Sequence, residues 1–117
     1  MRIDEIMTRR VITVTPDDTL GTVRFHFRSA GIHHLLVLEA GRVVGVLSMH
    51  ELAAKSDDVK VRGAMSVHFT SVAPDLPVRS AAAKMIGGGH GCVPVVDNGK
   101  LVGIVMTTDL MHSVMRV

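Results

Sequence analysis

The sequence contains one pattern twice, at a constant spacing of 58 positions, which is the separation of residues 7 and 65. No gap is needed to keep the two copies aligned. Identical pairs at this spacing are Met7 and Met65, Pro16 and Pro74, Gly31 and Gly89, Gly41 and Gly99, Gly45 and Gly103, and Leu52 and Leu110. Solenoid repeats are shorter, about 20–50 residues. The pattern therefore predicts two equivalent units about a pseudo-twofold axis, which share a core because each is too small to bury its own sheet.

Each copy is predicted to be a βαββα unit of a mixed α and β (α+β) fold. The first repeat, residues 3–54, has a lead segment at 3–7, strands at 11–15, 34–38 and 43–47, a helix after Asp17-Asp18-Thr19, and a short helix from Ser48 to Ala54. The second repeat, residues 61–115, has a lead segment at 61–65, strands at 70–72, 93–96 and 101–105, a helix opened by Pro74-Asp75, and a last helix over 107–114. Residues 55–60 are the linker within a single module of residues 1–117.

The apolar periodicity of the two longer helices predicts which faces are buried. In the first repeat this face consists of Leu20, Val23, Phe27 and Ala30, and in the second of Val78, Ala81, Ala82, Met85 and Ile86. Arg24, Arg28 and Lys84 are assigned to the solvated faces.

The stretch from Gly91 to Leu110 has the clearest local signals. Asn98-Gly99 lies between two apolar β-branched runs, and both residues tolerate the positive φ of a tight hairpin turn. The second run leads into Thr107-Thr108-Asp109, which is typical of a helix N-terminus. The junction between this strand and this helix is where we expect a small ligand to bind.

Composition argues against several classes of function. The formal charge of +2, without a basic run or an aromatic platform, argues against a nucleic-acid partner. No apolar run approaches the roughly 18 residues of a membrane span, and the first residues lack the apolar stretch of a signal peptide. Cys92 is the single cysteine, which excludes an intrachain disulfide and fits a reducing compartment. A cytoplasmic chain without a membrane partner is the expectation.

The chain resembles the cystathionine-β-synthase (CBS) domain pair. The motifs of the second repeat are Thr70-Ser71-Val72-x-Pro74-Asp75, Val93-Pro94-Val95-Val96-Asp97, and Leu101-Val102-Gly103-Ile104-Val105 leading to Asp109-Leu110. Those of the first are Thr13-Val14-x-Pro16-Asp17, Leu36-Val37, and Val43-Val44-Gly45-Val46-Leu47 leading to Glu51-Leu52. The resemblance extends from Ile3 to Met111.

This resemblance implies a regulatory module that binds an adenosine-containing ligand in the clefts between the repeats. The ligand classes implied are AMP, ADP, ATP and S-adenosylmethionine. In the family, a Ser/Thr-x-x-Asp motif supplies a carboxylate for the ribose hydroxyls. Carried over to the second repeat, Asp109 would bind ribose, and Thr107 and Thr108 would bind phosphate or ribose. The adenine walls would be formed by Thr70, Ser71, Val72, His90, Val93 and Pro94, with Ile104 also in the site.

Each repeat has one half of that signature. Met106 stands where the second repeat needs Ser or Thr, whereas the first repeat has Ser48 but carries Glu51 in place of Asp. A weaker site of Ser48, Glu51 and Thr13 is therefore predicted in the first repeat. Asp109 could instead be only a helix-capping carboxylate, and Ser48 with Glu51 only a capping box.

Other interpretations are weaker. The histidines have no pair at the helical i, i+4 spacing of the known zinc motif, so no metal site is predicted, although His50 and His90 could meet phosphate. Gly87-Gly88-Gly89 follows a helix, the reverse of a phosphate-binding loop, and is predicted to end that helix. No nucleophile or paired-carboxylate arrangement suggests an enzyme. The main alternative to nucleotide sensing is a structural module that dimerises without nucleotide, and the resemblance implies a homodimer in either case.

Overall fold

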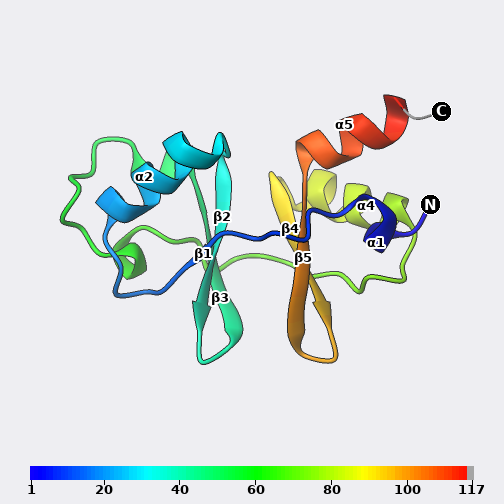
Figure 1. Cartoon of the computed structure of the whole chain (residues 1–117), viewed down its shortest axis with the longest axis horizontal. Coiled ribbons are helices and arrows are strands. Elements are labelled where there is room, and N and C mark those ends of the chain that lie inside the picture. Colours follow the sequence, from blue (N-terminus) through cyan, green and yellow to red (C-terminus); the bar gives the residue numbers. More distant parts are fainter. Residues whose placement is uncertain (116–117) are drawn as a thin grey trace. The chain divides into compact units, whose positions relative to one another are not determined.

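The computed structural model describes residues 1–115, and its chain divides into two compact units (Figure 1). One unit is continuous, from Ile12 to His68. The other combines Met1–Val11 with the segment that begins at Phe69. The units therefore do not coincide with the sequence repeats, because the first residues of the chain pack with the second repeat.

The Ile12–His68 unit is a three-stranded sheet with helices. Strand β1 (Thr13–Val14) pairs in parallel with β2 (His34–Glu39), which pairs antiparallel with β3 (Arg42–Ser48). Helix α2 (Leu20–Ala30) ends at Gly31, whose φ of 64° is the left-handed conformation predicted for it. Helix α3 (Met49–Leu52) and the 3₁₀ turn η1 (Val61–Gly63) complete the unit.

The other unit contains the predicted hairpin. Strands β4 (Cys92–Asp97) and β5 (Lys100–Met106) are joined by Asn98 and Gly99, with φ of 51° and 78°, so the predicted hairpin turn is confirmed. Helices α1 (Ile3–Ile6), α4 (Val78–Gly88) and α5 (Thr107–Met115) pack around it. The predicted strand at 70–72 is wrong, since only Val72 makes an isolated bridge, to Val95.

The residue that follows each lead segment, Thr8 in one case and Ser66 in the other, pairs with the last strand of the opposite repeat. Thr8 exchanges two main-chain hydrogen bonds with Ile104 on β5, at 2.8 and 3.0 Å. Ser66 does the same with Val46 on β3, at 2.9 Å in both directions. Glycines 103 and 45 allow this approach, because a Cβ on either would lie 3.1 Å or less from the main chain of the lead segment. Sequence periodicity contains no signal for this exchange.

Each unit has its own cluster of buried apolar side chains. The predicted helix faces are partly correct. Leu20, Val23 and Phe27 are buried, but Ala30 is exposed. On α4, Ala81 and Met85 are buried whereas Ile86 is 83% exposed.

Candidate functional site

The candidate site lies where β5 ends and α5 begins. Asp109, in the first turn of α5, is half-buried, and both of its carboxylate oxygens are engaged. Oδ2 accepts the backbone N–H of Met106 at 2.8 Å, and Oδ1 accepts the hydroxyl of Thr8 at 3.0 Å. The first contact is one half of a capping box, in which a side chain of the first turn accepts the N–H of the residue just before the helix. The second joins residues 101 positions apart, and sequence reasoning missed it.

Two hydroxyls lie beside this carboxylate in the sequence. Thr107 and Thr108 are both exposed at the start of the nine-residue helix α5. The Thr107 hydroxyl donates a long hydrogen bond of 3.4 Å to the carbonyl of Gly91. Exposed hydroxyls and free N–H groups at a helix start are suited to an anion such as phosphate.

The residues expected to surround the adenine differ in how far they are exposed to solvent. Val72, Val93, Pro94 and Ile104 are buried in this unit, and Thr70 is half-buried. Val72 is bonded through its backbone, with its N–H donating to Pro94 at 3.0 Å, and both main-chain groups of Ile104 are bonded to Thr8. Only Ser71 is fully exposed among these expected wall residues. The buried members therefore support the strands rather than offer side chains to solvent.

His90 is half-buried at the end of α4. Its backbone N–H donates to the carbonyl of Met85 at 2.9 Å, and its ring lies directly over Gly88. A Cβ on Gly88 would be 2.5 Å from that ring, so the glycine makes room for the imidazole.

The corresponding junction of the first repeat has the predicted capping box. Glu51 Oε2 accepts both the backbone N–H of Ser48, at 3.0 Å, and the Ser48 hydroxyl. His34 is opposite Ser48 in the sheet, and burial lowers the pKa of its imidazole while the charge of Glu51 partly opposes this effect. Thr13 lies half-buried on β1, opposite Leu36.

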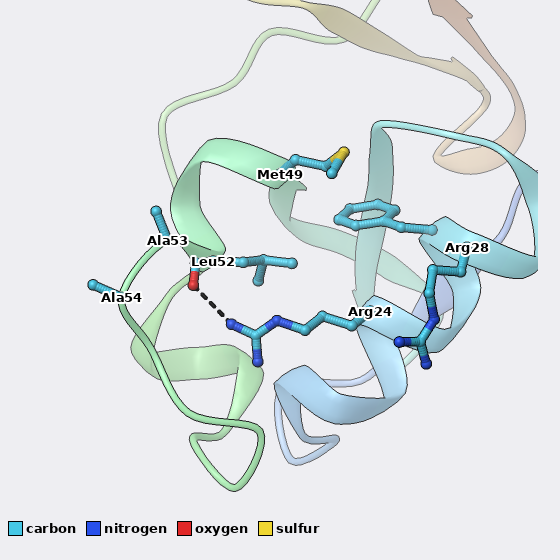
Figure 2. A pocket seen from close by; sticks show the side chains of 7 residues that line it. Arg24, Arg28, Met49, Leu52, Ala53 and Ala54 are labelled. Atoms are coloured by element: carbon cyan, nitrogen blue, oxygen red, sulfur yellow. Dashed lines mark hydrogen bonds between the residues drawn. The ribbon is translucent and has the colours of Figure 1, made fainter.

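A hollow of about 350 Å³ between α2 and α3 was not foreseen from the sequence (Figure 2). It is mainly apolar and is lined by Arg24, Phe27, Arg28, Met49, Leu52, Ala53 and Ala54. The prediction that Arg24 is a solvated side chain is wrong. Its guanidinium is half-buried and donates to the carbonyls of Leu52, at 2.8 Å, and Lys55, and to the carboxylate of Asp57.

Within residues 1–115, no three His, Cys, Asp or Glu side chains are grouped so that they could hold a metal ion. None of the helices described there has the length and apolarity required to cross a bilayer.

The fold and the repeated junction define a tandem-repeat module of mixed helix and strand. The CBS domain model matches residues 3–58 and 59–116, and the chain therefore belongs to the CBS domain family. An uncharacterised protein of Methanocaldococcus jannaschii is 31% identical over 97% of this chain. The chain spans 44% of that relative's length, and 27% and 61% of two further relatives at 30% identity or more.

Solved structures share the fold. The CBS domain pair of protein MJ0100, crystallised with 5-methylthioadenosine and S-adenosyl-L-methionine, is similar with a TM-score of 0.90 and 22% identity, covering 99% of this chain and 97% of that one. CBSX2 in complex with AMP has a TM-score of 0.87 and 22% identity, covering 98% of this chain and 96% of that one. At this identity the likeness establishes the fold alone.

Proposed function

We propose that this chain is a regulatory module, not an enzyme, that binds an adenosine-containing ligand through Asp109. The observation that carries the proposal is a half-buried carboxylate at a strand-to-helix junction, held by two donors from the protein. An ionised carboxylate has about four acceptor positions, so two stay available for the two hydroxyls of a ribose. The ligands of the two similar solved structures, which all contain adenosine, support the same class.

The neighbouring groups fit the rest of such a ligand. Thr107 and Thr108 offer exposed hydroxyls at the start of α5, where a phosphate or another polar 5′ substituent can be bound. AMP, ADP, ATP and S-adenosylmethionine share the ribose and differ in this substituent, so they are the ligands to compare.

Thermal unfolding of the chain with each of these four ligands tests the proposal. A ligand at about 100 times its Kd adds about 2.7 kcal/mol of stability, which is readily measured. We expect Asp109→Ala to abolish the ligand-induced shift. Because this change also removes a helix cap, the shift is taken for each variant against its own ligand-free protein.

Asp97→Ala is the matched control, because Asp97 is an exposed carboxylate of the same unit at the end of β4. This variant should keep the full ligand-induced shift. Absence of a shift with all four ligands in the wild-type chain would refute the proposed function. A normal shift in Asp109→Ala would instead move the site to Ser48 and Glu51.

The alternative is a structural module that dimerises, and one set of residues favours it. Ile86 on α4 and Met111, Val114 and Met115 on α5 are between 61% and 83% exposed, all in one unit. Apolar helix surfaces of this kind suit a symmetric contact with a second copy. Light scattering of the purified chain tests this association, and a monomer would contradict it. The proposed regulatory role also implies a second protein that responds to the ligand-bound module.

A further inference from the structure

We infer that Thr8 is a positioning residue, whose hydroxyl holds Asp109 ready for the ribose diol and replaces the hydroxyl that Met106 lacks. The inference rests on the proposed function. The family signature places a hydroxyl three residues before the carboxylate, in the same strand-to-helix junction. Here that hydroxyl comes from the first residues of the chain instead, through the 3.0 Å contact with Oδ1.

The main chain of Thr8 is fixed where this contact requires it. Its N–H donates to the carbonyl of Ile104 at 2.8 Å, and its own carbonyl accepts the N–H of Ile104 at 3.0 Å. Ile104 is buried on β5, two residues before Met106. Thr8 is therefore attached to the same strand that leads to Asp109, and its β-branched side chain has few rotamers available.

The division of donors between the two oxygens suits a vicinal diol. Oδ1 accepts the Thr8 hydroxyl and Oδ2 accepts the Met106 N–H, so each oxygen keeps one acceptor position. Two neighbouring hydroxyls can then donate one to each oxygen. Without the Thr8 hydroxyl, the Met106 N–H is the one donor among residues 1–115 that still restrains the carboxylate, which can then turn more easily about its last torsion angle.

The first repeat provides an internal comparison. Ser66 corresponds to Thr8 at the 58-residue spacing and has the same pair of main-chain bonds, to Val46. Its hydroxyl, however, contacts the backbone of His68 at 3.3 and 3.4 Å and not Glu51. At Glu51, a single carboxylate oxygen, Oε2, accepts both the N–H and the hydroxyl of Ser48. That oxygen is therefore fully occupied, whereas at Asp109 each oxygen accepts one donor.

The test measures AMP and 2′-deoxy-AMP binding by calorimetry, using the full chain and three variants. Thr8→Val keeps the shape and removes the hydroxyl, Thr8→Ser keeps the hydroxyl, and Ser66→Ala is the matched control. We expect Thr8→Val to weaken AMP binding about tenfold, as the loss of a hydrogen bond to a charged group implies. Thr8→Ser and Ser66→Ala should bind AMP within twofold of the wild type.

The ratio of the two Kd values separates positioning from a general structural effect. Destabilising the unit weakens both ligands alike. Misorienting Asp109 weakens AMP, which donates two hydroxyls to the carboxylate, more than 2′-deoxy-AMP, which donates only its 3′ hydroxyl. The preference for AMP over 2′-deoxy-AMP should therefore decrease in Thr8→Val and be restored in Thr8→Ser. If Thr8→Val does not fold, Thr8→Ala under the same comparison replaces it.

Two results would overturn the inference, and they are distinguishable. The first is that the wild-type chain binds AMP, and Thr8→Val has the same preference for AMP over 2′-deoxy-AMP as the wild type. This result would refute the role of Thr8 and leave the proposed function intact. A wild-type chain that binds none of AMP, ADP, ATP and S-adenosylmethionine at millimolar concentration would refute the proposed function and the role of Thr8 together.

Discussion

Gly103→Ala should loosen the attachment of the first residues of the chain to β5. A Cβ at this position would lie 2.6 Å from the sulfur of Met7 and 3.0 Å from the carbonyl oxygen of Thr8. The methionine is flexible enough to move aside, but the carbonyl belongs to a main chain bonded on both sides of Thr8. The added methyl group therefore pushes the lead segment away from the strand.

The expected size follows from two opposing terms. Overpacking of a well-filled site costs about 1–3 kcal/mol. Replacing a strand glycine by alanine gains about 0.5–1 kcal/mol, because the unfolded chain loses freedom. The free energy of unfolding should therefore fall by about 0–2.5 kcal/mol, with a central value of about 1.3 kcal/mol. With a urea m-value of about 1.5 kcal/mol/M, a loss of about 1.5 kcal/mol lowers the midpoint by about 1 M.

Urea unfolding measures the stability, and amide exchange of Thr8 and Ile104 locates the effect. Gly87→Ala is the control, because Gly87 is on α4 with open space around its Cβ position, and this variant should gain about 0.5–1 kcal/mol. A Gly103→Ala chain as stable as the wild type, with equal protection of both amides, would refute the close approach of the lead segment.

Two further predictions concern the Ile12–His68 unit. Arg24→Met should lower the free energy of unfolding in urea by about 1–3 kcal/mol, since the carbonyls of Leu52 and Lys55 lose a charged donor. Arg28→Met is the control and should have little effect. An equal loss of stability in both variants would contradict this role of Arg24. Because burial lowers the pKa of His34 below its ordinary 6.5, the unfolded chain binds its proton more readily, and stability is lost as the pH falls below about 6.5. His34→Gln should flatten the pH profile of unfolding between pH 7 and 5, and an unchanged profile would argue against it.

Local signals in the sequence were sufficient for most of the secondary structure. The Asn98-Gly99 turn and the left-handed Gly31 follow from backbone conformations that few other residues adopt. Failures occurred where pairing or coverage comes from distant residues. The strand expected at 70–72 has β propensity but finds only a single bridge at Val72. Ile86 fits the helical apolar period, yet nothing in the described structure of its unit covers it.

The sequence by itself determined the repeat, the family and the position of Asp109 at a helix start, because these depend on residue identity and on spacing within one short segment. Only the tertiary structure decided what Asp109 contacts. Thr8 and Asp109 are 101 residues apart, and they meet because the residue that follows the lead segment of one repeat pairs with the last strand of the other. Arg24 is similar, since its partners lie at the last residue of α3 and in the segment that follows it. Periodicity identifies the face of an element, but the packing of distant segments decides which groups meet there.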